Sequence, residues 1–184
     1  MKKFIISILG EDRPGIIAAV TKVLFQTDFN IEDVSQTILQ NQFSGIVITE
    51  GPDDITPDEL RRALEQETAA LDLHFHVRAL GPDAMAWTTC DCEPFVITTR
   101  GPDRKGLVAH VTALLAARNV NVTQLQAAFR GGDDPDKNVM IYEVDIPLDV
   151  DRQELRKALM DKGREFDLQI SIQHKDIFEA INRI

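Results

Sequence analysis

A seven-residue segment occurs twice in this chain, and the repeat constrains the fold more than any other feature. The two copies are Gly10-Glu11-Asp12-Arg13-Pro14-Gly15-Ile16 and, ninety-one residues later, Gly101-Pro102-Asp103-Arg104-Lys105-Gly106-Leu107. Each copy follows an apolar run and precedes an amphipathic one, which is typical of a turn from a strand into a helix. Two such turns in matched settings indicate an internal duplication.

A second pair of segments matches with a different spacing. The letters ELRRAL at 59–64 correspond to ELRKAL at 154–159, an offset of ninety-five residues. Four extra residues must therefore lie between the matched segments of the second half. We place them in the acidic loop Gly131–Asp136, because hairpin loops tolerate insertions.

The spacing of apolar residues predicts the same order of elements in both halves. In the first half we expect a strand at 3–9, a helix at 14–28, hairpin strands at 30–40 and 43–49, a helix after Thr56 and a strand near 73–78. In the second half the corresponding elements are expected at 95–100, 104–118, 121–130, 138–146, after Asp151 and at 168–173. Both second helices begin at a capping sequence, with an acid three residues after the cap.

Two β-α-β-β-α-β units with right-handed crossovers predict an α+β fold of the ferredoxin-like type. Each unit would have an antiparallel four-stranded sheet with its helices on one face. The expected divisions of the chain are a first domain at 1–80, a linker at 81–94, a second domain at 95–174 and a C-terminal helix at 175–184.

The expected C-terminal helix carries an apolar stripe. Ile177, Ile181 and Ile184 have helical spacing, and Phe178 lies beside them. A helix this short is marginal alone, so we expect the stripe to be buried on its own chain or on a second copy.

Composition excludes several classes of function. The 184 residues carry a formal net charge of −10 with a pI near 4.8, and no basic stripe occurs. Direct binding to nucleic acid is therefore not expected, nor is binding to an anionic membrane surface. No apolar run approaches the roughly 20 residues of a membrane span.

The start of the chain and its cysteines indicate the compartment. The apolar run from Phe4 to Leu9 is short and is interrupted by charge, so we interpret it as a first strand rather than a signal peptide. We therefore expect a cytoplasmic protein, in which Cys90 and Cys92 are reduced thiols.

The repeated turn has two interpretations from its residues alone. Asp12 and Asp103 can cap the helices that follow, Pro14 suits a first helical turn, and this interpretation needs no ligand. Alternatively, the unpaired amides at the helix start could bind an anion such as a ligand carboxylate, with the aspartate facing an ammonium group. Arg13 and Arg104 could hold a carboxylate or simply be solvated.

Asp12-Arg13-Pro14-Gly15-Ile16 after the first strand, with Asn30-Ile31 opening the second, resembles the ACT domain. ACT domains are small regulatory modules that typically bind amino acids. The resemblance covers nearly the whole chain, twice. Two such units with no attached enzyme are similar to the stand-alone tandem-ACT regulatory proteins, which include glycine cleavage system transcriptional repressors.

The resemblance implies a ligand site between two ACT units, within one chain or between two copies in a homodimer. One unit would supply its turn, and the other would supply the residues that open its second strand. The implied ligand-binding residues are Gly10, Glu11, Asp12, Arg13, Pro14, Gly15, Ile16, Asn30, Ile31, Gly101, Asp103, Arg104, Gly106, Leu107, Asn121 and Val122.

The chain departs from the pattern of the serine-sensing members of that family. Those members carry His where Gly10 and Gly101 stand, and Asn where Asp12 and Asp103 stand. Lys105 also replaces the proline that stands at position 14 in the first unit. The resemblance therefore does not imply serine as the ligand, and the two half-sites are free to differ in affinity.

Other kinds of site find less support. His74 and His76 alternate along one strand and could bind zinc with Cys90 and Cys92, but the spacing matches no standard zinc pattern. The Gly131–Asp136 loop lacks the regularly spaced oxygen ligands of a calcium loop. We therefore expect no metal and no cofactor.

Three functions follow in order of preference. The first is a non-catalytic regulatory protein that binds a small amino acid and acts through a protein partner, for example a transcriptional regulator. The second is an acylphosphatase-like enzyme, which shares the fold and needs an arginine and an asparagine around a phosphate. The third is an interaction module without a ligand. Fold alone does not decide among them.

The charge balance generates a first prediction: this protein does not bind duplex DNA with useful affinity. Counterion release from neutralised phosphates supplies most non-specific affinity, and a chain with net charge −10 cannot supply it. In a mobility-shift assay with random duplex at low salt we expect no complex. A shifted band at low micromolar protein would contradict the prediction.

Overall fold

The computed structural model describes residues 1–81, 91–128 and 138–182. The chain divides into two compact units, Met1–Trp87 and Thr88–Ile184. Each unit is an α+β sandwich of one sheet and its helices, so the predicted duplication is present in the structure.

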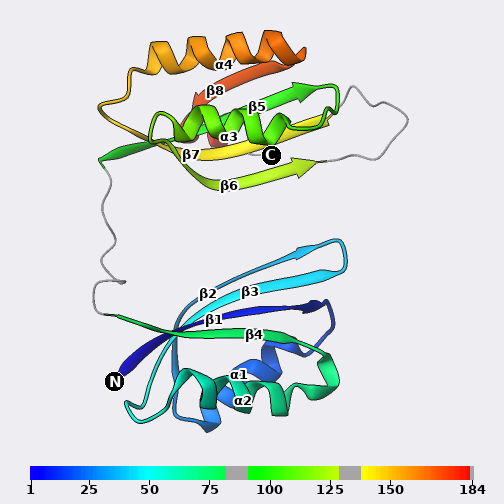
Figure 1. Cartoon of the computed structure of the whole chain (residues 1–184), viewed down its shortest axis with the longest axis vertical. Helices are drawn as coiled ribbons and strands as arrows, with labels where there is room; N and C mark the ends of the chain where they lie inside the picture. The colour runs from blue at the N-terminus through cyan, green and yellow to red at the C-terminus, as the bar shows by residue number, and fades with distance from the viewer. Residues whose placement is uncertain (82–90, 129–137, 183–184) are drawn as a thin grey trace. The chain divides into compact units, whose positions relative to one another are not determined.

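Unit 1 has the predicted β-α-β-β-α-β order. Its elements are β1 (Lys2–Glu11), α1 (Ile16–Gln26), β2 (Asn30–Leu39), β3 (Gln42–Gly51), α2 (Pro57–Glu67), a 3₁₀ turn η1 (Ala69–Leu71) and β4 (His74–Leu80). The strands pair antiparallel in the order β2-β3-β1-β4. Both helices cover the same face of this sheet (Figure 1).

Unit 2 repeats the plan and adds a helix. Its elements are β5 (Cys92–Gly101), α3 (Leu107–Ala116), β6 (Asn121–Ala128), β7 (Asn138–Pro147), α4 (Arg152–Phe166), β8 (Gln169–His174) and α5 (Lys175–Asn182). The strand order β6-β7-β5-β8 is the same as in unit 1. The ferredoxin-like prediction is therefore confirmed for both units.

Several boundaries differ from the sequence prediction. The helices α1 and α3 begin at Ile16 and Leu107, two and three residues later than expected. Strand β5 begins at Cys92, inside the stretch expected to be a linker. Residues 129–137, which include the Gly131–Asp136 insertion, lie outside the described part of the chain, as do residues 82–90.

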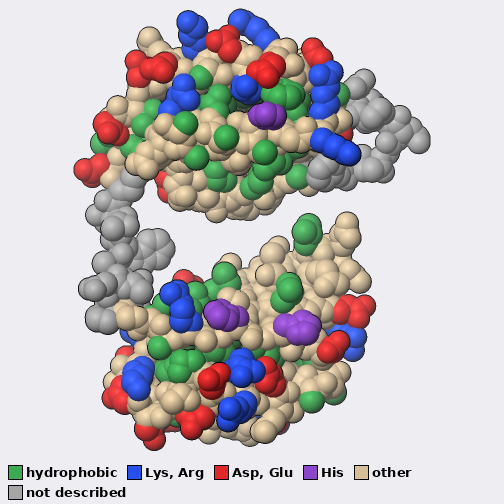
Figure 2. All heavy atoms as spheres, in the orientation of Figure 1, with side chains coloured by type: hydrophobic (Ala, Val, Ile, Leu, Met, Phe, Trp, Pro, Cys, Tyr) green, Lys and Arg blue, Asp and Glu red, His purple; other side chains and the backbone are tan. Residues whose placement is uncertain are grey.

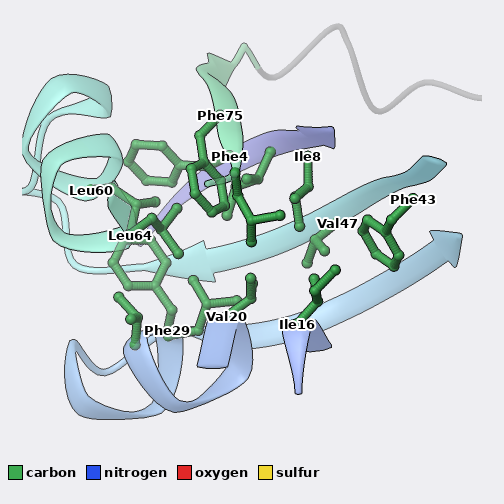
Figure 3. Close-up of a cluster of buried hydrophobic side chains, with 14 residues drawn as sticks. Phe4, Ile8, Ile16, Val20, Phe29, Phe43, Val47, Leu60, Leu64 and Phe75 are labelled. Atoms are coloured by element: carbon green, nitrogen blue, oxygen red, sulfur yellow. The ribbon is translucent and has the colours of Figure 1, made fainter. Parts of the chain in front are cut away.

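Alternation along the central strand β1 builds the core of unit 1. Phe4, Ile6 and Ile8 are at most 1% exposed because they all point from the sheet toward the helices. Figure 3 shows Phe4 and Ile8 in one cluster with apolar side chains from α1 and α2, among them Ile16 and Leu64. Burial of each such side chain stabilises the fold by about 1.5–3 kcal/mol.

The core of unit 2 follows the same register but includes a polar atom. Ile97 of β5 and Leu115 of α3 are fully buried, and so is Tyr142 of β7. The Tyr142 hydroxyl donates a hydrogen bond to the Sδ atom of Met140 at 3.2 Å. Burial raises the pKa of Tyr142 to about 12.

The predicted caps of the second helices are present. At the start of α2, the Glu59 amide donates to the Thr56 hydroxyl and the Thr56 amide donates to the Glu59 carboxylate, a reciprocal capping box. The hydrogen bond from the Thr56 hydroxyl lowers the pKa of Glu59. At the start of α4, Asp151 accepts from the amides of Gln153 and Glu154.

The C-terminal helix α5 lies on the sheet face of unit 2 that α3 and α4 leave open. It is anchored by the Lys175–Glu143 ion pair at 2.7 Å, and Val96 on that face is only 2% exposed. However, Ile177 and Ile181 are 54% and 68% exposed, so the expected burial of this stripe is wrong within a single chain. Ile184 lies outside the described residues.

Charged side chains of both signs are interspersed over the visible surface of each unit (Figure 2). This distribution agrees with the scattered basic residues of the sequence. Within the described part of the chain, no helix is long and apolar enough to cross a membrane.

The buried tyrosine generates a prediction for alkaline pH. A tyrosine ionises near pH 10 in an unfolded chain, whereas Tyr142 does so at about 12 in the folded protein. The unfolded state therefore loses its proton first, and the free energy of unfolding falls as pH rises from about 10 to 12, by an amount on the order of 2–3 kcal/mol. Urea unfolding across this pH range measures the loss.

The matched control is Tyr142→Phe, which removes the only tyrosine of the chain. Lysines also titrate in this range, so the quantity that matters is the difference between the two proteins. The variant should be less sensitive to alkaline pH than the parent. If the free energy of unfolding fell equally with pH in both proteins, Tyr142 would not be the group responsible for the loss of stability.

Candidate functional site

The turn of unit 1 is held by backbone and ion-pair contacts. The Asp12 amide donates to the Asn41 carbonyl at 2.7 Å, which fastens the turn to the β2–β3 hairpin. The Arg13 guanidinium donates to the Glu11 carboxylate at 2.8 Å. The side chain of Asp12 is exposed and makes no hydrogen bond among the described residues.

Neither aspartate caps its helix, so that part of the sequence interpretation is wrong. The N-cap residues are Gly15 and Gly106, with left-handed φ angles of 100° and 90° and no side chain to offer. This conformation is strained for residues with a Cβ and readily adopted by glycine. It also explains why both helices begin later than predicted, after Pro14 in unit 1.

The glycine caps leave the first helical amides available. The first hydrogen bonds inside α1 and α3 run from the Ala19 amide to the Gly15 carbonyl and from the His110 amide to the Gly106 carbonyl, both at 2.9 Å. The amides of residues 16–18 and 107–109 precede these bonds, and of these the Leu107 amide donates to the Arg104 carbonyl at 3.5 Å. They point along the positive end of the helix dipole, where an anion is stabilised.

The glycines that end β1 and β5 are fixed by close packing. A Cβ at Gly10 would lie 2.6 Å from the Leu73 Cδ2 atom, and a Cβ at Gly101 would lie 2.7 Å from the Asp167 carbonyl oxygen. Both contacts are too short for real atoms. A histidine at either position, as in the serine-sensing members of the resembled family, would require the neighbouring chain to move.

The turn of unit 2 has a partly buried polar contact that the described residues of unit 1 lack. The Asn138 side-chain amide donates to the Asp103 carboxylate at 3.4 Å, and Asn138 is 8% exposed. Its Oδ1 atom has no hydrogen-bond partner among the described residues. The register places Asn138 opposite Gly101 and Phe43 opposite Gly10. The signal in the sequence is an asparagine where the first unit has a core phenylalanine.

A surface hollow lies beside this second turn. The Arg104 guanidinium pairs with the Asp167 carboxylate at 2.6 Å, which links the turn to the C-cap residue of α4, two residues before β8. The hollow has a volume of about 400 Å³ and is lined by Arg100, Gly101, Pro102, Asp167 and Gln169. Sequence reasoning had selected Gly101 from this set but not the three polar residues.

The predicted asparagines lie far from the turn of their own unit. Asn30 opens β2 and pairs with Glu50, near the end of β3, whereas Gly10 pairs with Phe43 at the start of the same strand. Seven residues of strand separate these two pairs, about 23 Å at a rise of roughly 3.3 Å per residue.

Unit 2 repeats this separation. Asn121 pairs with Asp145, near the end of β7, and Gly101 pairs with Asn138 at its start. A register shift follows each asparagine, at Ile31 and at Val122. The structure therefore does not bring a turn together with the asparagine of its own unit.

The candidate zinc site gains no support from the described residues. His74 and His76 are both exposed on β4, and no group of three potential metal ligands occurs in the described ranges. Cys92 is disulfide-bonded, so the expectation that both cysteines are reduced thiols is wrong. Cys90 lies outside the described residues.

Comparison with known proteins identifies relatives of both units. A family model described as "ACT domain" matches residues 2–78 and again residues 93–173. A UPF0237 protein from Pyrobaculum aerophilum is 43% identical over 68 residues, which cover 36% of this chain and 76% of that relative. One from Methanococcus maripaludis is 38% identical over 93 residues, covering 50% of this chain and 99% of the relative.

Two solved structures share the whole two-unit fold. A protein of unknown function from Galdieria sulphuraria has a TM-score of 0.76 and 23% identity, with 94% of this chain and 98% of that chain covered. A protein provisionally named as a glycine cleavage system transcriptional repressor has a TM-score of 0.70 and 20% identity, with 94% and 96% covered. At these identities the likeness shows the fold alone.

The corrected role of Asp12 gives a prediction for stability. Asp12→Ala should change the free energy of unfolding by no more than about 0.5 kcal/mol, because the carboxylate caps nothing. Thr56→Ala removes a capping box that is present and should cost about 1 kcal/mol. Chemical denaturation of the two variants provides the comparison. Equal losses from both would mean that Asp12 stabilises the turn in a way these contacts do not reveal.

Proposed function

Since this chain belongs to the ACT domain family through both of its units, we propose that it is a non-catalytic regulatory protein that binds a small amino acid. We further propose that the ligand lies at the seam between two ACT units. At this seam the turn of one unit would face the first residues of the second strand of the other unit. The two units are those of one chain or of two copies in a homodimer.

One observation carries this proposal: in each unit the turn and the asparagine lie at opposite ends of the sheet. A separation of about 23 Å is several times the length of a small amino acid. A site that uses both groups must therefore take them from different units. The resulting pairs are the turn of Gly10–Ile16 with Asn121, and the turn of Gly101–Leu107 with Asn30.

The chemistry of the turn suits a zwitterionic ligand. The amides at the starts of α1 and α3 have no side-chain cap, and apart from the Leu107 amide, which donates to the Arg104 carbonyl, they are donors for a carboxylate. Asp12 is an exposed anion that can face an ammonium group, whereas Asp103 already accepts a hydrogen bond from Asn138. The two half-sites therefore differ, and we expect them to differ in affinity.

Affinity must be modest for a ligand of this size. A serine-sized molecule has about seven non-hydrogen atoms, and the best ligands gain about 1.5 kcal/mol per atom. This ceiling of roughly 10 kcal/mol, reduced by the exposure of the turn, favours a Kd of about 10 μM to 1 mM. Such affinities match metabolite concentrations that a regulator would sense.

The response would pass to a protein partner rather than to DNA. A ligand at a seam adds contacts that only one arrangement of the units makes, and this is how a ligand shifts a population. A net charge of −10 disfavours DNA as the direct target. The structural relative provisionally named as a transcriptional repressor motivates a transcriptional regulator as the partner. We propose the cytoplasm as its location.

The enzyme alternative is weakened by the same contacts. An acylphosphatase-like site needs a free arginine close to an asparagine. Arg13 is paired with Glu11, Arg104 is paired with Asp167, and each asparagine lies at the far end of its unit. An assay for acyl phosphate hydrolysis should therefore be negative. Turnover in that assay would favour the enzyme.

The proposal predicts stabilisation by at least one of the twenty common amino acids. A ligand at 100 times its Kd adds about 2.7 kcal/mol to the free energy of unfolding, which a thermal melt detects readily. With the stabilising amino acid in hand, calorimetry on Asn30→Ala and Asn121→Ala should show weaker binding by at least about tenfold at one site.

The matched controls are Gln36→Ala and Gln126→Ala, exposed polar residues further along the same strands β2 and β6. Their affinities should equal that of the parent. If no amino acid shifts the melting temperature, the chain is better described as an interaction module without a ligand. If the asparagine variants bind as well as their controls, the seam arrangement is wrong.

A further inference from the structure

The residues beside the two turns differ in a way that concerns the ligand directly. In unit 2, the hollow of about 400 Å³ lies where β5 ends and β8 begins. This volume falls within the range of sites that bind small molecules. The corresponding strand positions in unit 1 hold Leu9, which is 52% exposed, and His74.

One side of the hollow offers hydrogen-bond donors. Arg100 and Gln169 form a cross-strand pair between β5 and β8, so their side chains leave the same face of the sheet, with Cβ atoms about 5 Å apart. Among the described residues Arg100 makes no ion pair, and it is exposed. A planar guanidinium binds a carboxylate through two parallel hydrogen bonds, and a glutamine amide can add a third.

The other side offers an acceptor. Asp167 uses Oδ2 to accept from Arg104 at 2.6 Å. A carboxylate has two oxygens and about four acceptor sites, so it can still accept from an ammonium group. The position of this residue is fixed, because its amide donates to the Gly163 carbonyl and its φ is 56°. Lining residues of opposite charge thus lie in one small hollow.

We propose that this hollow binds the head group of a free α-amino acid, with its carboxylate on Arg100 and Gln169 and its ammonium group on Asp167. The inference rests on the amino-acid binding proposed above, and in unit 2 it assigns the head group to the hollow in place of the helix-start amides and Asp103. The ligand side chain is left to face the turn or a second unit.

Unit 1 cannot form the same contacts. Leu9 stands where unit 2 has Arg100, so no guanidinium is available for the carboxylate. Asp72 stands where unit 2 has Asp167, but Arg13 pairs with Glu11 rather than with it. The head-group site therefore occurs once per chain.

The test uses glycine as the probe, because it is almost entirely head group. In a two-dimensional amide NMR titration of the full chain up to about 50 mM glycine, we expect saturable shifts at Arg100, Gly101 and Gln169. The amides of Leu9 and His74 should not shift. Glycinamide, which lacks the carboxylate, and acetate, which lacks the ammonium group, should each bind at least about tenfold more weakly.

Variants then assign the contacts. Arg100→Gln should weaken glycine binding at least about tenfold, and Asp167→Asn should weaken it while leaving acetate unaffected. The matched control is Arg78→Gln, which changes an exposed arginine on β4 of unit 1 that does not line the hollow and should not alter glycine affinity. Amide spectra of each variant establish that it is folded.

Two outcomes would overturn the inference, and they can be told apart from failure of the proposed function. If glycine or another amino acid shifts the amides at the helix starts and at Asn30 or Asn121, but not those of the hollow, the proposed function stands and the head-group site falls. If none of the twenty amino acids shifts any resonance saturably, both fall. Unchanged glycine affinity in Arg100→Gln also overturns the inference.

Discussion

The close approach between the end of each central strand and the segment before each last strand is the constraint on which the candidate site depends. Gly10 lies against Leu73, and Gly101 lies against the Asp167 carbonyl and Leu168, with no space for a Cβ in either place. The contact holds the end of β1 against β4 and the end of β5 against β8. Each turn therefore starts from a fixed point at the same end of its sheet.

The conformation of the second glycine in each turn decides whether a side chain caps the helix that follows. Because Gly15 and Gly106 are left-handed and occupy the N-cap positions, no side chain satisfies the first helical amides. The starts of α2 and α4 show the contrast, since Thr56 and Asp151 satisfy theirs. Helices that are capped contribute stability, whereas helices without a side-chain cap keep donors for a ligand.

The sequence was sufficient to predict the fold, because alternation in the strands, helical spacing and the repeat all agreed. It also located both turns. It failed at the helix start: Asp12 was expected to cap through its side chain, but a left-handed glycine three residues later occupies the N-cap position instead. Arg100 and Gln169 could not be found either, since their proximity arises from the pairing of β5 with β8, which no local pattern encodes.

Duplication followed by divergence explains why the two units are alike in fold and different in chemistry. The glycines and the strand register are shared, so both turns have the same backbone frame. The side chains around them are not: Phe43 is replaced by Asn138, and Leu9 by Arg100. A buried asparagine whose Oδ1 has no partner among the described residues costs stability relative to an apolar residue unless a ligand or water compensates. Unit 2 carries this asparagine and the exposed Arg100 beside one turn, where unit 1 has apolar residues, and this difference underlies the proposed head-group site.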